Sequence, residues 1–348
     1  MDELQAVLAF SQLKGSSTKK FLDLYQFYGS ALEAYKKIKP QPELERFSEN
    51  ELLTAKANSI SLIPITSADY PASLKILSDA PLVLYVKGKL PDSHLPKIAI
   101  VGTRSATSWG KDCTHHFAKI LASYGIFVVS GLARGIDTAA HSGAIEKSVA
   151  FIGSGLLHLY PKENEKLAET IAEKGAIVSE FLLNAPPTRY SFPKRNRLIA
   201  AFSDALLLTE APKKSGAMIT MRIGSTLKKA LFCLPGRALN EPYAGNHQLI
   251  KEGNARLVES PQELAKFLDI ASKPPQITLG QKPIIFDEEK KILDFLGQSD
   301  LSIDELFCFT RLPISHLQAL LTKLVIKNLA VELPGKRYKR TRDAWQNH

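Results

Sequence analysis

Seven short apolar runs recur between residues 97 and 260, and most are separated by stretches long enough for one helix. The runs read KIAIVG, IFVVSG, VAFIGSG, AIVSE, DALLLTE, LFCLPG and ARLVES. Runs that are apolar at every position, rather than at alternate positions, are typical of parallel strands buried on both faces. The pattern therefore predicts an α/β domain whose extended parallel sheet is covered by helices on both sides. A further short strand is expected at 82–86.

The segment before these runs has a different pattern. Residues 1–57 carry apolar residues at helical spacing, with Gly15 and Gly29 between the helical stretches. This spacing predicts a small amino-terminal helical domain. The sheet domain is then expected to span residues 58–270. Residues 271–285 are rich in proline and polar residues, which is typical of a linker.

The segment 286–348 predicts a third domain. Its pattern indicates three helices followed by a hairpin around Pro334 and Gly335, which is the order of elements in a winged helix. The second and third helices are expected to begin with capping boxes, in which a serine and a Glu or Gln three residues later bond each other's backbone. The paired residues are Ser302 with Glu305 and Ser315 with Gln318.

The first residues and the cysteines favour a cytoplasmic protein. The chain begins MDELQAVLAF, with two acids where a signal peptide needs basic residues, and no apolar run approaches 18 residues. No membrane insertion is therefore expected. Cys113, Cys233 and Cys308 lie far apart and form no CxxC motif. This spacing argues against a zinc site and against a disulfide framework.

The net charge of +10 is concentrated in one part of the sheet domain. Residues 186–237 contain ten basic residues and only two acidic ones. The core of this segment, TRYSFPKRNR, places Tyr190 and Phe192 among four cations, which are Arg189, Lys194, Arg195 and Arg197. Cations hold phosphates and aromatic rings stack on unpaired bases, so the segment predicts single-stranded nucleic-acid binding. A solvated loop with Phe192 in the core remains the alternative.

Three candidate features follow strands whose carboxyl ends share one rim of the sheet. Arg104 follows the first strand of the series, the turn SGLARG with Gly131 and Arg134 follows the second, and the arginine–aromatic segment follows the fourth. Parallel sheets bind ligands at this rim. The glycines are expected to bring backbone N–H groups close to a phosphate, and Asp137 is interpreted as a residue that holds the turn. Arg134 either contacts the phosphate or braces the turn.

The spacing of the glycines argues against small cofactors. No GxGxxG follows the first strand, and the stretch from Gly102 to Lys111 has seven residues where a Walker loop has four. No Ser/His/Asp constellation, paired carboxylates or metal cluster accompanies the rim, so a binding site without catalysis or cofactor is expected. Two alternatives stay open. One is a nucleoside-phosphate hydrolase, which would lack the PGGxGT loop of that class, and the other is a winged-helix transcription regulator.

An ordered set of motifs extends from about residue 60 to 260. It comprises ADYPASLKILSDAPLVLYVKG, VGTR, SGLARGIDTAAH, YPKENEKL, SEFLL, FPKRNRLIAAFSDALLLTEAPKKSGAMIT, LPGR and GNHQLIKEG. In order and spacing these motifs resemble the DNA-processing protein A family (DprA, also called Smf). The resemblance implies an extended Rossmann-like domain, an amino-terminal domain of the helix-hairpin-helix or SAM type and a variable carboxyl-terminal domain.

The resemblance also implies a function. Members of this family are cytosolic bacterial proteins of natural transformation, or competence. Such a protein binds incoming single-stranded DNA, displaces or acts beside single-strand-binding protein, and loads RecA recombinase for DNA recombination. It forms a homodimer through the Rossmann-like domain, has no enzymatic activity and binds no cofactor.

By position, the resemblance assigns roles to individual residues. Arg104 and Arg189 correspond to the principal phosphate-holding residues, and Phe192 corresponds to a ring that contacts a base or gates the pocket. The walls or supports of the pocket correspond to Gly131, Arg195, Asn196, Arg197, Ser215 and Gly216. The two arginines of the RNR sequence are alternatively structural, through pairs with Glu180 or Glu210.

Two segments depart from the family pattern. The turn LKGSST keeps Gly15 but has Ser17 where a helix-hairpin-helix turn has its second glycine, so residues 1–57 are not expected to bind DNA. In the winged helix, the third helix exposes only Lys323 and Lys327 as cations. DNA contact, solubility and partner docking all stay open for the cations of the wing and tail, which are Lys336, Arg337, Lys339, Arg340 and Arg342.

Overall fold

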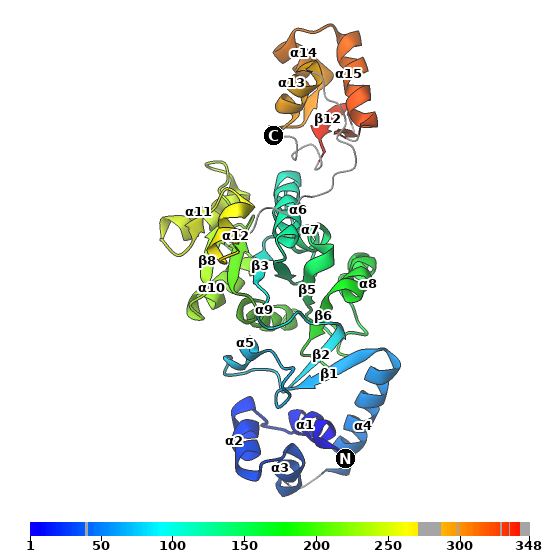
Figure 1. Ribbon diagram of the computed structural model, residues 1–348, viewed down its shortest axis with the longest axis vertical. Helices are drawn as coiled ribbons and strands as arrows, with labels where there is room; N and C mark the ends of the chain where they lie inside the picture. Colours follow the sequence, from blue (N-terminus) through cyan, green and yellow to red (C-terminus); the bar gives the residue numbers. More distant parts are fainter. Residues whose placement is uncertain (39–40, 271–286, 298, 328, 334, 342–348) are drawn as a thin grey trace. The chain divides into compact units, whose positions relative to one another are not determined.

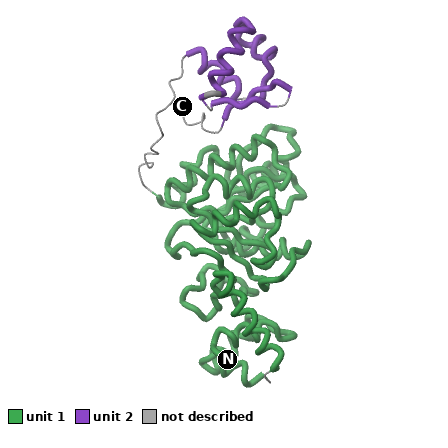
Figure 2. Tube along the Cα trace, turned by 90° about the vertical axis from the view of Figure 1, so that its right-hand side faces the viewer, with its two compact units in different colours: residues 1–275 green, residues 276–348 purple. Residues whose placement is uncertain are grey.

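The computed structural model describes residues 1–348 except 39–40, 271–286, 298, 328, 334 and 342–348. The chain divides into two compact units, Met1–Pro275 and Gln276–His348 (Figure 2). The linker expected at 271–285 lies outside the described residues. No helix in the described part of the chain is long and apolar enough to cross a membrane.

The larger unit is built on a sheet whose described strands have the order β1-β2-β6-β5-β4-β3-β7-β8-β9 (Figure 1). Their bounds are β1 Ile60–Pro64, β2 Val83–Gly88, β3 Lys97–Val101, β4 Phe127–Ser130, β5 Ser148–Phe151, β6 Ala176–Ser179, β7 Ala205–Leu208, β8 Ala230–Cys233 and β9 Arg256–Leu257. From β6 to β9 every neighbouring pair is parallel, as the apolar runs predict. β1 and β2 extend the sheet in antiparallel fashion at the β6 edge. The fold is therefore α/β with a largely parallel sheet, and β1 is a strand that the apolar pattern does not predict.

Alternate side chains of the central strands enter two separate cores. Ile98 and Ile100 of β3 belong to a core with α6, α7 and α12, whereas Ala99 and Val101 belong to a core with α8, α9 and α10. The described helices between residues 72 and 267 have the bounds α5 Ala72–Lys75, α6 Ser108–Ser123, α7 Ile136–Gly143, α8 Glu165–Lys174, α9 Ser191–Phe202, α10 Gly216–Thr226, α11 Ala244–Lys251 and α12 Pro261–Phe267. Because both faces of the sheet are covered, every residue of the central strands β3 to β7 is buried, and most of these residues are apolar.

Four amino-terminal helices pack against the second of these cores. They are α1 Glu3–Ser11, α2 Thr18–Tyr28, α3 Ala31–Lys37 and α4 Pro42–Ala57. Gly15 and Gly29 lie between α1, α2 and α3 as expected, with φ angles of 75° and 70° that favour glycine. The Glu51 carboxylate of α4 accepts a 2.8 Å hydrogen bond from the backbone N–H of Leu183, beyond β6. The helices therefore belong to the same compact unit as the sheet.

The smaller unit has the elements of a winged helix. They are α13 Asp287–Leu296, β10 Leu301–Ser302, α14 Ile303–Thr310, α15 Ile314–Ile326, β11 Ala330–Leu333 and β12 Arg337–Arg340. β12 pairs with both β10 and β11. Ser302 and Glu305 form the expected capping box. The capping box expected at Ser315 is wrong, because the N-cap of α15 is Pro313, two residues earlier, and Ser315 lies inside the helix.

Several cations of the winged helix are held by carboxylates. Lys327 lies with its Nζ 2.8 Å from the carboxylate of Glu289, whose side chain is 1% exposed. Lys327 is the C-cap of α15 and its side chain is only 23% exposed, so the expectation that it is an exposed cation of this helix is wrong. On the wing, Arg337 pairs with Glu305 over 3.2 Å, and Arg342 lies outside the described residues.

Candidate nucleic-acid interface

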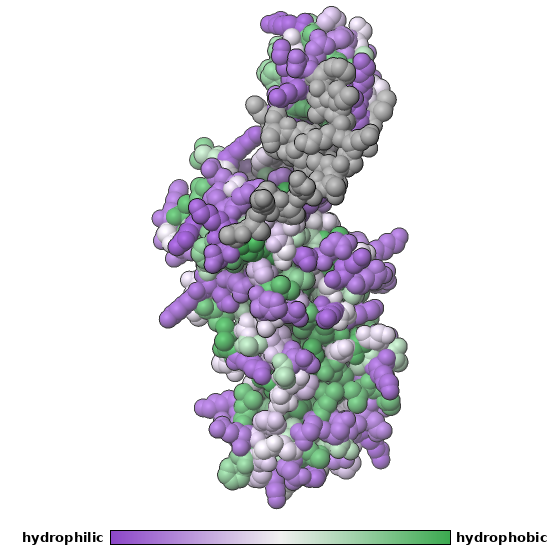
Figure 3. Space-filling view, viewed as in Figure 1, coloured by the Kyte–Doolittle hydropathy of each residue, from purple (hydrophilic) through white to green (hydrophobic). Residues whose placement is uncertain are grey.

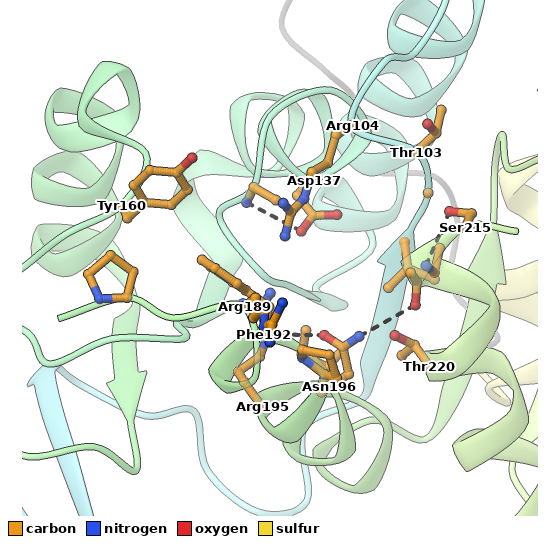
Figure 4. A pocket seen from close by; sticks show the side chains of 18 of the residues that line it. Thr103, Arg104, Asp137, Tyr160, Arg189, Phe192, Arg195, Asn196, Ser215 and Thr220 are labelled. Carbon is orange, nitrogen blue, oxygen red and sulfur yellow. Dashed lines mark hydrogen bonds between the residues drawn. The ribbon is translucent and has the colours of Figure 1, made fainter. Parts of the chain in front are cut away.

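The carboxyl ends of the strands frame a cavity of about 720 Å³. β3 and β7 are neighbours, and the strand order runs outward from them in opposite directions, which makes this the topological switch point where such sheets bind ligands. Figure 4 shows side chains that converge on the cavity, and they come from the segments after β3, β4, β5, β6 and β7. The segments predicted to share one rim therefore meet at one cavity.

Positive charge dominates the lining of this cavity. The segment after β3 contributes Arg104, the region around the start of α9 contributes Arg189 and Arg195, and the loop before α10 contributes Lys214. Among the described lining residues the only carboxylate is that of Asp137, which is buried and accepts hydrogen bonds from the backbone. The cavity therefore presents an excess of positive charge, which suits a phosphate or a phosphodiester.

Aromatic rings lie beside these cations. The guanidinium of Arg104 lies 4.8 Å from the centre of the Phe192 ring. The centres of the Tyr160 and Phe192 rings lie 5.7 Å apart. Residue 153 must be glycine for this arrangement, because a Cβ there would lie 2.8 Å from the Phe192 ring. Tyr160 is not among the predicted site residues, although it begins the YPKENEKL motif and follows β5 at the same rim.

Arg195 is buried next to the cavity and connects three elements. Its guanidinium donates to the carbonyl of Gly131, over 2.6 Å, and to the carbonyl of Phe151, so it ties α9 to the ends of β4 and β5. A Cβ at residue 131 would lie 2.5 Å from this guanidinium, so Gly131 makes room for Arg195. Burial lowers the pKa of Arg195 to about 10, and Asp137 opposes that change. The guanidinium therefore remains charged at neutral pH.

The SGLARG turn is closed by bonds within the protein. Asp137 Oδ2 accepts hydrogen bonds from the N–H groups of Gly131, over 3.1 Å, and Ala133, over 3.3 Å. The Nε2 atom of His141 accepts the N–H of Leu132 over 3.3 Å. The interpretation that Asp137 holds the turn is thus confirmed. The N–H groups of Gly131, Leu132 and Ala133 are therefore used within the turn and are not available to a phosphate.

The amino terminus of α10 opens on the cavity instead. The Oγ of Ser215 caps this helix and accepts the N–H of Ala217 over 3.2 Å. Gly216 also lines the cavity, and no atom lies within 4 Å of the position that a Cβ would take there. Asn196 of α9 donates to the carbonyl of Gly216 over 3.5 Å, which links the two helices beside the cavity (Figure 4). The positive end of α10 is therefore the backbone element best placed to receive a phosphate.

The sequence predicts two further site arginines, Arg189 and Arg134, of which Arg189 lines the cavity and Arg134 does not. Arg189 is exposed, and its guanidinium lies 4.7 Å from the ring centre of Tyr190, which is 69% exposed. Arg134 is also exposed and pairs with Glu163, with Nη2 and Oε2 3.0 Å apart. In this structure Arg134 therefore braces the turn against the segment after β5.

The remaining cations of the segment face away from the cavity. The segment is helical from Ser191, so positions 192, 195 and 196 share one face of α9 while positions 194 and 197 lie on another. Arg197 pairs with Glu180 over 2.8 Å and with Asp79 over 2.7 Å, and Lys194 lies 3.5 Å from the same Glu180. Arg197 is therefore structural, which was one of the two roles left open for it. Neither Lys194 nor Arg197 lines the cavity.

The expected pair with Glu210 is not formed. The buried carboxylate of Glu210 instead accepts the backbone N–H of Thr107 over 2.9 Å and its hydroxyl over 2.5 Å. These bonds anchor the loop after β3, which carries Arg104, to the end of β7. The two loops on either side of the switch point are thereby held together.

Residues 61–269, which contain the cavity, match the sequence model of a family described as DNA recombination-mediator protein A. The matched region is more than half of the chain. The chain belongs to this family. Residues 281–336 match a second model, described as DprA winged helix domain, so the smaller unit is the winged-helix domain known from DprA proteins.

Curated relatives carry the names of the DprA/Smf family. The chain is 38% identical to Protein Smf of Escherichia coli over 224 residues, which is 63% of this chain and 60% of that protein. It is 34% identical over 258 residues to DNA processing protein DprA of Bacillus subtilis, with 73% of this chain and 80% of that protein covered. The match thus spans less than two thirds of the Escherichia coli protein.

Solved DprA structures share the fold. The X-ray structure of DprA from Streptococcus pneumoniae aligns with a TM-score of 0.65 at 29% identity and covers 76% of this chain and 98% of that one. DNA processing protein A from Helicobacter pylori, whose structure is described as showing a unique single-stranded DNA binding mode, aligns with a TM-score of 0.55 at 35% identity. That alignment covers 60% of this chain and 95% of the other.

Proposed function

We propose that the chain binds single-stranded DNA in the cavity at the switch point and loads RecA recombinase onto that strand during natural transformation. The observation that carries the proposal is the joint lining of one cavity by Arg104, Arg189, Lys214 and Phe192. Guanidinium and ammonium groups neutralise phosphates, and an aromatic ring offers a surface on which a base of any identity can stack. The description of the Helicobacter pylori relative as a single-stranded DNA binder supports the same ligand.

An unpaired strand suits this cavity better than a duplex. Phe192 and Tyr160 lie within a concave lining, and a base that is stacked in a duplex must be unstacked before it reaches a ring inside a cavity. Unpaired bases avoid most of that cost of a few kcal/mol. We therefore expect discrimination between single strands and duplexes, with little dependence on base sequence.

Binding rather than hydrolysis is the proposed activity. Asp137 is the carboxylate of the described lining, it is buried, and its Oδ2 already accepts the N–H groups of Gly131 and Ala133. Within the described ranges, no three His, Cys, Asp or Glu side chains are grouped so that they could hold a metal ion. The lining thus offers phosphate-holding cations without a free general base.

The partners of the proposal are RecA, single-strand-binding protein and a second copy of the chain. RecA and single-strand-binding protein meet the same strand, and the homodimer forms through the Rossmann-like domain. The site of action is the cytoplasm. An assay of RecA loading on strands coated with single-strand-binding protein tests this part, because the proposal requires faster RecA filament formation in the presence of the protein.

Titration with matched single-stranded and duplex oligonucleotides tests the strand binding. We expect tighter binding of the single strand. The variant Arg104→Ala/Arg189→Ala should lower the slope of log affinity against log salt by about 1.4, because each phosphate contact on a single strand contributes roughly 0.7. A matched control is Lys166→Ala/Lys174→Ala on α8, away from the cavity lining, which should leave the slope unchanged.

Two results would contradict the proposal. One is duplex affinity equal to or above single-strand affinity. The other is unchanged affinity and salt slope in the Arg104→Ala/Arg189→Ala variant. Release of a base or of phosphate from a panel of nucleotides would instead support the hydrolase alternative.

A further inference from the structure

We propose that the DNA strand leaves the cavity along the exposed face of α10, past Ile219 and Arg222 toward Lys228. This face then forms a second segment of the binding site, outside the cavity. The inference rests on the single-stranded DNA binding proposed above, and it adds the direction in which the strand continues.

The charge of the segment that contains α10 is the first reason. Residues 211–240 include no Asp or Glu but six cations, which are Lys213, Lys214, Arg222, Lys228, Lys229 and Arg237. Lys213, Lys214, Arg222 and Lys228 are exposed. No ion pair with a described carboxylate involves any of these four side chains. Their charge is therefore available to the phosphates of a polyanion.

The geometry of α10 is the second reason. The helix begins at the cavity with Gly216, and its exposed positions Ile219, Arg222 and Thr226 follow at spacings of three, three and four residues. Residues at this spacing lie on one face of a helix. From Gly216 to Thr226 the helix extends about 15 Å, at roughly 1.5 Å per residue. This length would span about four phosphates at the roughly 3.4 Å axial spacing of one strand in a duplex, and fewer phosphates in an extended unpaired strand.

The opposite side of the cavity is less favourable to a polyanion. α8 lies between β5 and β6 in the chain, on the other half of the sheet from α10, and Figure 1 shows the two helices on opposite sides of β3. In residues 162–174, the four acids Glu163, Glu165, Glu169 and Glu173 outnumber the three cations Lys162, Lys166 and Lys174. Figure 3 shows hydrophilic side chains projecting on both sides, near α10 and near α8, so the two directions differ in the balance of their charges rather than in polarity.

A third direction, over the far face of α9, is neutralised by ion pairs. There Lys194 and Arg197 line a separate cavity of about 560 Å³ together with Glu180 and Asp79. Both cations are paired with these carboxylates. Of the three directions, only α10 therefore offers exposed cations that continue from the cavity without interleaved acids.

Binding of two strand lengths tests the inference in the full-length protein. The perturbed variant is Arg222→Gln/Lys228→Gln, and the matched control is Lys166→Gln/Lys174→Gln on α8. The probes are labelled oligothymidylates of six and twenty nucleotides. The hexamer reports on the cavity, whereas the 20-mer is long enough to reach along α10 as well.

The variant should bind the 20-mer about 25-fold more weakly at 0.1 M salt, because a slope of roughly 0.7 per phosphate corresponds to about fivefold for each lost contact. Its salt slope should fall by about 1.4. Its affinity for the hexamer should stay at the wild-type value, which also shows that the cavity is folded. The α8 control should bind both probes as the wild type does.

Unchanged binding of the 20-mer by the α10 variant would overturn the inference, as would an equal loss in the α8 control. These results leave wild-type binding of the hexamer intact and so concern only the path along α10. Failure of the wild-type protein to bind either probe would overturn the proposed function itself, and the inference with it.

Discussion

Replacement of Arg195 by methionine removes a buried cation without leaving the full volume of the side chain empty. Arg195 is 3% exposed and donates to the carbonyls of Gly131 and Phe151. It also lies beside the buried carboxylate of Asp137, and its charge favours the ionised form of that group. Loss of one partner from a buried charged pair costs about 3–5 kcal/mol. We expect the free energy of unfolding of Arg195→Met to fall by about this amount at neutral pH.

The cost should depend on pH in a defined direction. Burial raises the pKa of Asp137, and Arg195 opposes that change, so the variant raises this pKa further. An acid whose pKa is higher in the folded state binds a proton that the unfolded chain has released, and this favours the folded state as pH falls. The loss in Arg195→Met should therefore be smaller at pH 5 than at pH 8, relative to the wild type at each pH.

A second substitution isolates the cause. Asparagine at position 137 keeps an oxygen that can accept the N–H groups of Gly131 and Ala133 but carries no charge. We expect Arg195→Met/Asp137→Asn to recover about 1–3 kcal/mol of the loss and to abolish its pH dependence. Urea unfolding followed by circular dichroism measures these values. An equal loss at both pH values, together with no recovery in the double variant, would refute this account of Arg195.

Three further changes test other parts of the structure. His141 is buried as a neutral ring that accepts the N–H of Leu132 and contacts Ser148 over 2.6 Å, and burial lowers its pKa from 6.5 to about 3. Because the unfolded chain binds the proton more readily than the folded chain, the wild type should lose about 2 kcal/mol of unfolding free energy between pH 7 and pH 5. The variant His141→Gln should not show this loss. Urea unfolding at both pH values checks this, and identical pH profiles would contradict it. Gly131→Ala should lower the free energy of unfolding by about 1–3 kcal/mol, since the new Cβ would lie 2.5 Å from the Arg195 guanidinium. Thermal unfolding should show a smaller loss when the same change is made in the Arg195→Met variant. Lys327→Met removes the 2.8 Å ion pair with the buried Glu289. We expect the winged-helix unit to lose about 3 kcal/mol of unfolding free energy, the lower end for a buried pair because the Lys327 side chain is 23% exposed, while affinity for single-stranded DNA stays unchanged. A calorimetric scan and a binding titration check this, and an unchanged unfolding temperature would contradict it.

The parallel part of the fold is predictable from sequence because strands that are buried on both faces appear as short, nearly continuous apolar runs. Each of β3 to β8 is mostly apolar and lies within a few residues of one of the apolar runs of the sequence. β1 has no such run. It lies at the antiparallel edge, is only partly buried, and reads ISLIP directly after the last amino-terminal helix. Its pairing with β2 depends on tertiary contacts that no local pattern reports.

The site was predictable in location but not in detail. The rule that loops meet at the carboxyl rim correctly brought Arg104, Arg189 and Phe192 to one cavity. The direction of each side chain depends on the helical phase of α9, which starts at Ser191 and turns Lys194 away. Arg197 has two partners: Glu180, which the sequence suggested, and Asp79, which lies 118 residues earlier in the chain and could not be predicted from local spacing.

The SGLARG turn shows how a local motif can be misread. Its two glycines are typical of a phosphate-binding turn, but one of them makes room for Arg195, and Gly135 approaches the backbone of Thr103 so closely that a Cβ would lie 2.4 Å from its carbonyl oxygen. The demand for glycine at both positions therefore comes from packing within the protein. Sequence alone does not distinguish a glycine that is required by packing from a glycine that is required by a bound ligand.

The central claim is that an unpaired strand enters the cavity at the switch point. Photocrosslinking measures this most directly. A single-stranded oligonucleotide with one 4-thiothymidine is irradiated with the full-length protein, and the adducts are located by peptide mapping. The account predicts adducts at Tyr160 and Phe192, which line the cavity, and their loss in Arg104→Ala/Arg189→Ala. Adducts confined to the winged helix or to residues 1–57, with none from the cavity lining, would contradict it.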